Sequence, residues 1–362
     1  MDSRYIADWR MHNLRLSGPP FEAPEDVVHW LGAVQSQDYG PAKWSVAERT
    51  GGVSDAAMDQ AVADGAILRT HVLRPTWHFV LPSDIRWMLE LTAPRVHALN
   101  AYQYRQLGLD DAVLEQCTAL LAGALRGGKQ RTRKDIAAML EGAGVATKGF
   151  RLGYILMNAE LNGINCSGAL HGKQHTYALL DERAPQAKRL THDEALAELT
   201  LRYFTGHGPA TAKDFRWWSS LTAADSKQGL EMVASQLEHE VIDGLSYWFA
   251  EPARSPKAVS PTVHLLQGLD EYIVGYSESK YVLDASGGAR SLPLDKVVFN
   301  HVVILDGQVA GHWKRTLKKG SVVIEAALST PFDDARAQAL QAAADMHGAF
   351  LGLTATVVTT QL

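Results

Sequence analysis

Residues 132–181 read TRKDIAAMLEGAGVATKGFRLGYILMNAELNGINCSGALHGKQHTYALLD. Thr132 and Asp135 have the spacing of a capping box, which begins a helix. Apolar residues then recur at helical intervals in two runs that Gly-Ala-Gly separates, and Asn162-Gly163 ends the second run. The segments INCSGA and HTYALLD, on either side of the polar tip LHGKQ, read as two short strands. Two helices followed by a hairpin are typical of a winged helix-turn-helix.

The same order of elements recurs on both sides of this stretch. Residues 191–250 contain three capped helices and the hairpin EVIDGLSYWF, with Asp243-Gly244 at its turn. Nearer the N-terminus, a helix that begins at Pro24 is expected to run into Gln35, and another is expected at about 54–65. The segment ILRTHVLRPTWHFVL then reads as two strands around Arg74-Pro75. We therefore expect three winged helices in tandem.

From about residue 261 the residue pattern changes from helical to β-rich, with the turn signals Asp306-Gly307 and Lys318-Lys319-Gly320 between the β-rich runs. The predicted fold class is α+β, with three tandem winged helix-turn-helix modules followed by a small antiparallel β-barrel or sheet domain. The predicted organisation is a first winged helix at 1–82, connecting helices at 83–127, a second winged helix at 128–188, a third at 189–257 and the β-domain at 258–362.

Composition and charge exclude several classes of protein. The 362 residues are 46% hydrophobic and 21% charged, which is ordinary for a globular protein. No apolar run is long enough for a membrane helix, and Cys117 and Cys166 cannot form a disulfide framework or a four-thiolate zinc site. We expect a cytoplasmic, monomeric protein. The net charge of −5 argues mildly against nucleic acid, but RGGKQRTRK (126–134) and WKRTLKK (313–319) contain no acid.

The stretch VQSQDYGPAKW, residues 34–44, places Gln35 and Gln37 two positions apart. Because the residue before Pro41 avoids helical torsions, the sequence predicts that a helix ends here. In extended backbone the two amides would then share a face and project together from the helix end. The alternative is a polar C-terminal turn whose amides bond to nearby backbone.

QSQD after an amphipathic helix resembles the start of the AlkZ-like family of bacterial DNA glycosylases, the azinomycin-resistance type. RTHVLRPTWHFV resembles that family's first wing, and HGPATAKDFRWWSSL its third module. LLQGLDEYIVGYSESKYV (265–282) and DGQVAGHWKR (306–315) resemble its C-terminal β-domain. The Gln-x-Gln motif matches one branch of the family, whereas a sister branch has Gln-x-Asp. One departure is Ser220, where the family pattern leads us to expect glycine.

The resemblance implies excision of alkylated purines from double-stranded DNA. An N7-alkylated guanine already carries positive charge and leaves as a neutral base, so no general acid is needed. What remains is to place water against the sugar and to orient the sugar, and amide groups can do both by hydrogen bonding. Gln37 is the preferred water-positioning residue, and Gln35 orients the water or the sugar. Asp38 is a competing candidate for the base or for the stabiliser of an oxocarbenium-like sugar. The alternative is that it satisfies a turn or accepts from Arg69 or Arg74.

Basic side chains on three segments are candidates for contacts with DNA phosphates. On the first wing, where we expect them at the surface, they are Arg69, His71, Arg74 and His78, with the alternative that His78 is a core histidine. At a helix N-terminus they are Arg131, Arg133 and Lys134. Around the C-terminal hairpin they are Lys314, Arg315, Lys318 and Lys319. Trp217 and Trp218 are expected in the core.

The leading hypothesis is a monofunctional DNA glycosylase that releases N7- or N3-alkylated purines, including bulky natural-product adducts or crosslinks, and protects a producing bacterium. The alternatives are a non-catalytic winged-helix DNA-binding regulator and a protein-interaction scaffold. No Cys-His spacing fits zinc and no Gly-rich phosphate loop precedes a helix, so we expect neither a metal nor a cofactor.

Overall fold

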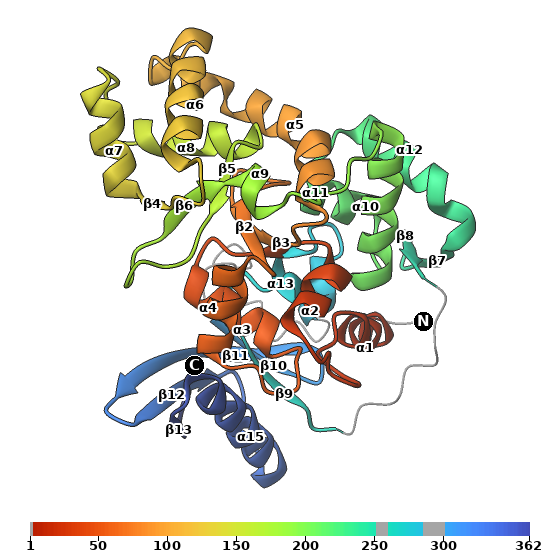
Figure 1. The fold of residues 1–362 in the computed structure, drawn as a ribbon. Coiled ribbons are helices and arrows are strands. Elements are labelled where there is room, and N and C mark those ends of the chain that lie inside the picture. The colour runs from red at the N-terminus through yellow and green to blue at the C-terminus, as the bar shows by residue number, and fades with distance from the viewer. Residues whose placement is uncertain (1–2, 251–259, 285–300) are drawn as a thin grey trace. The chain divides into compact units, whose positions relative to one another are not determined.

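The computed structural model describes residues 3–250, 260–284 and 301–362. The chain divides into two units (Figure 1). Unit 1 is formed by Met1–Met58, Thr200–Trp218 and Ser226–Leu362, and unit 2 by Asp59–Leu199 and Ser219–Asp225. Helices and several sheets are mixed in the chain, which confirms the expected α+β class. Within the described ranges, no helix combines the length and the apolar character needed to cross a membrane.

Unit 2 contains the helix–helix–hairpin order expected for residues 128–183. Its elements are β2 (Leu68–His71), β3 (Trp77–Val80), α5 (Ile85–Gln106), α6 (Asp111–Leu125), β4 (Arg131–Thr132), α7 (Arg133–Gly142), α8 (Arg151–Leu161), β5 (Asn165–Ser167), β6 (Thr176–Leu179) and α9 (Leu180–Arg183). The capping box is confirmed, because the Asp135 N–H donates to Thr132 Oγ1 at 3.2 Å and the Thr132 N–H donates to Asp135 Oδ2 at 3.0 Å. Gly163 follows α8 at a φ of +67°, which favours glycine and ends the helix.

The core of unit 2 forms where α6, α7 and α8 bury their apolar faces against one another, around Leu121, Leu140 and Ile155. Cys117 of α6 belongs to this core, and Cys166 of β5 is also buried. Burial raises the pKa of both thiols, and that of Cys166 rises to about 12. Both cysteines are free thiols.

Unit 1 brings together segments from both ends of the chain. Its elements are α1 (Ser3–Asn13), α2 (Pro24–Leu31), β1 (Val34–Gln35), α3 (Tyr39–Ala47), α11 (Ala212–Ser219), η1 (Ala234–Gln236), β7 (Glu238–Ile242), β8 (Leu245–Phe249), β9 (Val263–Leu266), α13 (Glu271–Val274), η2 (Lys280–Asp284), β10 (His301–Leu305), β11 (Gln308–Lys318), β12 (Ser321–Leu328), α15 (Asp334–Leu351) and β13 (Thr354–Gln361). Three of the boundaries between the units fall within α4 (Asp55–Asp64), α10 (His192–Gly206) and α12 (Ala223–Val233). A fourth boundary lies at the end of α11, before its last residue, Ser219.

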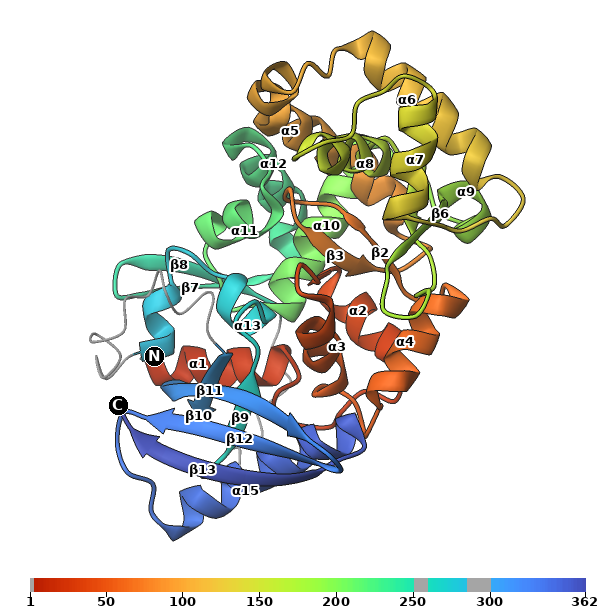
Figure 2. The ribbon, with the colours of Figure 1, turned by 90° about the vertical axis from the view of Figure 1, so that its left-hand side faces the viewer.

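A five-stranded sheet in the order β13-β12-β11-β10-β9 carries α15 across one face (Figure 2). The four strands β9 to β12 are antiparallel, but β13 pairs with β12 in parallel. The expectation of a purely antiparallel sheet is therefore wrong, because α15 returns the chain to the end of the sheet where β12 began. The alternative of a barrel is also wrong, since the sheet of the described strands is open, with β13 and β9 at its two edges.

Local turn chemistry is confirmed at both Asp-Gly pairs. Asp243 and Gly244 have φ values of 50° and 78°, and Asp306 and Gly307 have 47° and 75°, as a tight hairpin turn requires. In the segment expected to form the third module, the Thr211–Asp214 cap is present, with the Asp214 N–H donating to Thr211 Oγ1 at 3.2 Å.

The two tryptophans of α11 lie in different environments. Trp218 is fully buried, as expected for a core residue, whereas Trp217 is 55% exposed and the core prediction for it is wrong.

Ser220, which stands where we expect glycine, has a φ of +59°. An L-residue in this left-handed region carries a strain of about 1–2 kcal/mol, from which glycine is exempt. Ser220→Gly should therefore raise the thermal midpoint by about 2 to 4 °C. This corresponds to an increase of about 1 kcal/mol in the free energy of unfolding, after subtraction of the extra conformational entropy that glycine loses on folding. Calorimetry checks this result. Ser220→Ala keeps the strain and is the matched control, so an equal gain in both variants would contradict the explanation.

His347 of α15 is buried between the rings of Trp44, at 4.7 Å, and Trp313, at 5.1 Å. Its Nε2 accepts a hydrogen bond from Arg315 Nη1 at 3.1 Å. Burial, together with the charges of Arg315 and His301, lowers the pKa of His347 from its ordinary 6.5 to about 3. The folded protein therefore keeps this imidazole neutral in mildly acidic solution.

This pKa makes stability depend on pH in one direction. Between pH 6.5 and 3 the unfolded chain binds a proton at His347 that the folded chain does not bind. The free energy of unfolding should fall by about 1.4 kcal/mol for each pH unit lost in that window. His347→Gln keeps an acceptor for Arg315 without titrating. Urea titrations of both proteins from pH 7 to 4 should give a shallower loss for the variant, and identical pH profiles would contradict the assignment.

Candidate functional site

The segment that carries Gln35 and Gln37 is an extended link between two helices. α2 ends at Leu31, because Gly32 follows with a φ of +76°. The prediction that this helix runs into Gln35 is therefore wrong by one turn. α3 then begins at Tyr39, with the extended backbone of Asp38 as its N-cap. The prediction that DYGP ends a helix is wrong as well, since Pro41 lies in the first turn of α3, where it displaces no helical hydrogen bond.

The two glutamines of this link have different environments. Gln35, in β1, is buried with 6% exposure, whereas Gln37 and Asp38 are exposed. The extended backbone expected at Gln35 is present, but the two side chains do not share one solvent-facing surface. Gln37 and Asp38 are thus the two of the three candidate catalytic residues that can meet a ligand directly.

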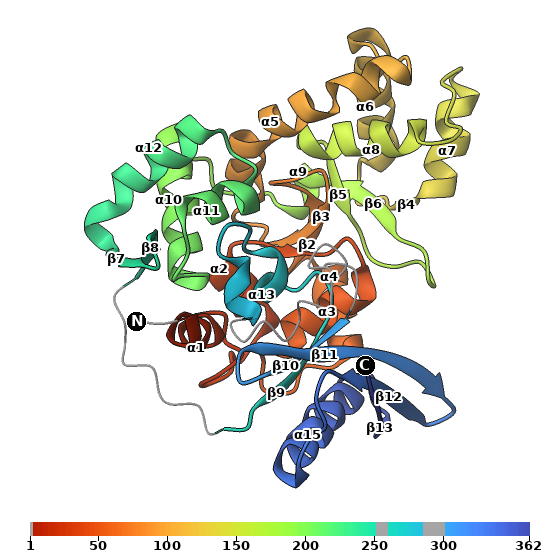
Figure 3. The ribbon, with the colours of Figure 1, turned by 180° about the vertical axis from the view of Figure 1, so that it is seen from behind.

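Glu271, at the start of α13, holds the backbone of this link. Its Oε1 accepts a hydrogen bond from the Gln35 N–H at 3.0 Å, and its Oε2 lies 2.8 Å from Trp218 Nε1 and 3.1 Å from His207 Nε2. Glu271 has no exposed surface. Figure 3 shows α13 next to α2, whose chain continues into β1. The segment QGLDEY therefore supports the glutamine motif, although the sequence gives it no role beyond family resemblance.

The neighbouring acid Asp270 secures α13 itself. Its carboxylate oxygens lie 2.8 and 2.9 Å from the two terminal nitrogens of Arg49, and the Tyr272 N–H donates to Oδ1 at 2.9 Å. Both partners of this ion pair are fully buried. The negative charge of Asp270 raises the pKa of Arg49, against the lowering effect of burial. In the sequence, the adjacent acids Asp270 and Glu271 lie in a mostly apolar stretch, and this is the signal that could have indicated a buried ion pair.

In unit 1, Asp38 and one predicted cationic residue, Arg315, influence the same histidine. Burial lowers the pKa of His301 on β10, the charge of Arg315 lowers it further, and the charge of Asp38 raises it. Asp38 and Arg315 therefore both act electrostatically on one imidazole. The Arg315 guanidinium is half-buried against His347.

The lysines of the same hairpin are exposed. Lys314 lies 2.9 Å from Glu325, and Lys318 and Lys319 are at the tip, where Gly320 has a φ of +78°.

The basic residues of β2 and β3, in unit 2, are less accessible than expected. Arg69, His71 and His78 are buried, and Arg74 is half-buried, so the expectation of a surface cluster is wrong. Arg69 and His71 both contact Trp77: the Arg69 guanidinium lies 4.5 Å from the Trp77 ring centre, and the His71 ring centre lies 4.3 Å from the Trp77 ring centre.

The rest of this cluster is tied down by hydrogen bonds. Arg74 Nη2 lies 3.3 Å from His78 Nε2, and His78 Nδ1 lies 3.0 Å from the Thr76 carbonyl, so the alternative of a core histidine fits His78. The buried Glu160 of α8 accepts from the His71 N–H at 3.1 Å and contacts the His71 ring. Sequence reasoning missed this acid. The third predicted group, formed by Arg131, Arg133 and Lys134, is exposed at the N-terminus of α7.

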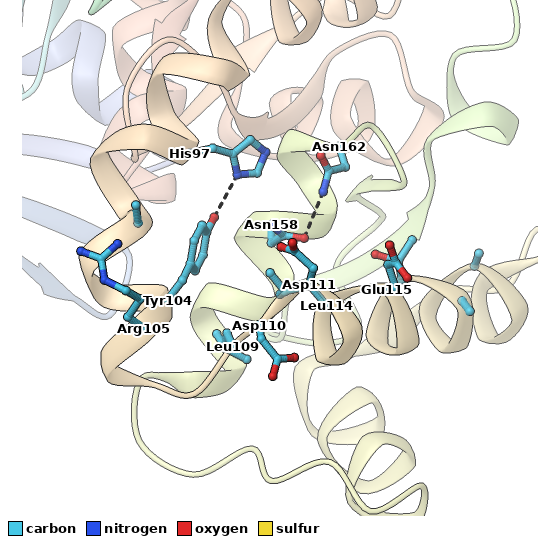
Figure 4. A pocket seen from close by; sticks show the side chains of 14 residues that line it. His97, Tyr104, Arg105, Leu109, Asp110, Asp111, Leu114, Glu115, Asn158 and Asn162 are labelled. Carbon is cyan, nitrogen blue, oxygen red and sulfur yellow. Dashed lines mark hydrogen bonds between the residues drawn. The ribbon is translucent and has the colours of Figure 1, made fainter.

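A cavity of about 820 Å³ lies between α5, α6 and α8 of unit 2 (Figure 4). On one side His97 Nδ1 lies 3.1 Å from the Tyr104 hydroxyl, and Asn162 Nδ2 donates to Asn158 Oδ1 at 3.0 Å. Burial lowers the pKa of His97. None of the predicted site residues lines this cavity, so its chemistry does not bear on the glutamine motif.

Known proteins resemble this chain in sequence and in fold. Residues 28–350 match the family described as DNA glycosylase AlkZ-like. The chain is 28% identical over 349 residues to the interstrand DNA cross-link repair glycosylase of Streptomyces sahachiroi, with 91% of each protein covered.

The fold is also found in a solved structure. The DNA glycosylase AlkZ of Streptomyces sahachiroi superposes with a TM-score of 0.79 over 99% of this chain and 100% of that chain, at 23% identity. This likeness shows a shared fold, and the family match covers most of the sequence. The chain therefore belongs to the AlkZ-like family of DNA glycosylases.

Proposed function

We propose that the protein hydrolyses the N-glycosidic bond of N7- or N3-alkylated purines in double-stranded DNA and leaves an abasic site. The observation that carries this proposal is the Gln35-Ser36-Gln37 link, which is extended between two helices, anchored at Gln35 and open to solvent at Gln37. An anchored residue beside an exposed amide suits the placement of one water molecule. Family membership favours this enzyme over the regulator and the scaffold.

The neutral side chains fit a substrate whose base already departs easily. The Gln37 carbonyl oxygen accepts a hydrogen bond from the attacking water, and its NH₂ donates to a sugar or phosphate oxygen. Gln35, with 6% exposure, acts by orienting this segment rather than by touching the sugar. Asp38 remains the competing base, because it is exposed beside Gln37. An undamaged purine is a poor leaving group and stays attached.

We further propose that the helix–helix–hairpin segments are winged helices that grip duplex DNA, with the module boundaries expected from the sequence. Such modules hold the duplex while the lesion is attacked in place, which suits adducts too large to be flipped into a pocket. The relative named as an interstrand DNA cross-link repair glycosylase supports bulky adducts or crosslinks as substrates here. We also propose that the protein is a cytoplasmic monomer and that it protects a producing bacterium from its own DNA-damaging product.

Gln37→Ala should abolish excision while DNA affinity is retained. Loss of the water-positioning amide should lower the single-turnover rate on N7-methylguanine DNA by about 100-fold or more, since misplacement of a reacting group has effects of this size. Alkali treatment of the product DNA measures the abasic sites, and electrophoretic mobility measures binding. Asp38→Ala is the matched comparison and should lose less than about tenfold. A larger loss in Asp38→Ala than in Gln37→Ala would transfer the catalytic role to Asp38.

The double variant Lys318→Ala, Lys319→Ala should weaken DNA binding without lowering the maximal excision rate. If both ammonium groups contact phosphates, the slope of log affinity against log salt should decrease by about 2, because each lost contact reduces it by about 1. Lys314→Ala is the comparison. Its ammonium group already lies 2.9 Å from Glu325, so this substitution should change the slope less. Fluorescence anisotropy between 50 and 200 mM salt, a range in which such slopes are readily resolved, measures both. An unchanged slope in the double variant would remove the hairpin from the DNA interface.

A further inference from the structure

We propose that Glu271 is a positioning residue for catalysis, which acts on Gln37 through the backbone of Gln35. The inference rests on the proposed role of the glutamines and adds a residue from the opposite end of the chain. The carboxylate contacts the motif at a main-chain group, the Gln35 N–H, at 3.0 Å. It fixes the direction of the link rather than meeting substrate, because Glu271 is fully buried.

Both carboxylate oxygens are committed, so the acceptor for Gln35 cannot rotate away. Oε1 accepts from Gln35, while Oε2 lies 2.8 Å from the indole nitrogen of Trp218 and 3.1 Å from His207 Nε2. The His207 ring is in turn stacked on Tyr203, with ring centres 4.8 Å apart and planes inclined by 13°. All of these groups belong to unit 1, so the arrangement is internal to one body.

The backbone beneath Glu271 is equally constrained. Asp270 precedes it and is bound by Arg49, and the Gly275 N–H donates to the Glu271 carbonyl at 2.9 Å. An acceptor fixed at both its side chain and its main chain determines where the Gln35 N–H points. Because Gln37 follows by only two residues, the same constraint limits the positions that its amide can take.

A carboxylate is required here because it offers acceptor oxygens at both ends. In Glu271→Gln one end becomes an NH₂ donor, and it must face either the Gln35 N–H or the Trp218 N–H. One buried donor is then opposed by another donor, which is unfavourable. Removing the indole N–H as well, in Trp218→Phe, relieves this conflict. The His207 ring proton can then shift from Nε2 to Nδ1, so that Nε2 accepts from the new NH₂ while the amide oxygen accepts from Gln35.

The experiment is a double-mutant cycle on Glu271 and Trp218, with single-turnover excision of N7-methylguanine and DNA affinity as the first readouts. Adding Glu271→Gln to the wild type should lower the excision rate on the order of 100-fold with DNA affinity changed less than about threefold. Adding it to Trp218→Phe should lower the rate less than about tenfold, because the conflict is relieved. The retained DNA affinity distinguishes this positioning role from a general loss of the fold.

Hydrogen exchange of the Gln35 amide provides a readout that is independent of activity. Its protection should fall in Glu271→Gln and return in the double variant. Asp214→Asn is the matched control: this buried acid of unit 1 accepts from the Ser277 N–H at 2.8 Å, and Ser277, Arg10 and Thr211, which contact its carboxylate, lie outside residues 34–38. Below its melting temperature it should keep both the excision rate and the protection of Gln35.

Three results would overturn the inference: unchanged Gln35 protection in Glu271→Gln, equal losses in both backgrounds, or an equal loss of excision in Asp214→Asn. Failure of the proposed function would look different. The wild type would then release no alkylated base, while the exchange pattern of the Gln35 amide would still follow Glu271.

Discussion

Two adjacent carboxylates that have been removed from water, Asp270 and Glu271, organise unit 1. A buried charge is tolerated only where other groups replace its lost hydration, so each acid dictates its surroundings. Asp270 is satisfied by the guanidinium of Arg49 and by a main-chain amide. Glu271 is satisfied by the Gln35 N–H of β1, the Trp218 indole N–H of α11 and the ring of His207. Segments more than 200 positions apart in the sequence are therefore fixed around one dipeptide. An N-terminal motif depends on a C-terminal segment for its geometry.

The parts of the fold that could be predicted from sequence are those set by nearby residues. Thr132 and Asp135 cap α7 because both partners lie within one turn, and the two Asp-Gly pairs form tight turns because their own torsions require it. The parallel pairing of β13 could not be predicted in this way. It depends on α15 carrying the chain back along the sheet, and no local pattern records the direction of a crossover.

In the candidate site too, features set by nearby residues could be predicted and features set by distant residues could not. The Gln-x-Gln motif and its extended backbone were accessible from sequence, but the end of α2 at Gly32 and the start of α3 at Tyr39 were not, because a helix of eight residues leaves little periodicity to read. The basic residues of β2 and β3 were placed at the surface on the strength of their charge. Glu160, a single acid on the buried face of α8, reverses that placement by offering His71 a partner inside the protein. Buried acids such as Glu160 and Glu271 were the missed signal.

The burial of the two cysteine thiols affects how the protein itself reacts with electrophiles that alkylate DNA. An electrophile that alkylates N7 of guanine also reacts with sulfur, and the thiolate is the reactive form of cysteine. Cys117 is 2% exposed and Cys166 is not exposed at all, and burial raises both pKa values, so neither sulfur is accessible or ionised at neutral pH. Burial therefore protects both thiols of this chain from alkylation by such an electrophile.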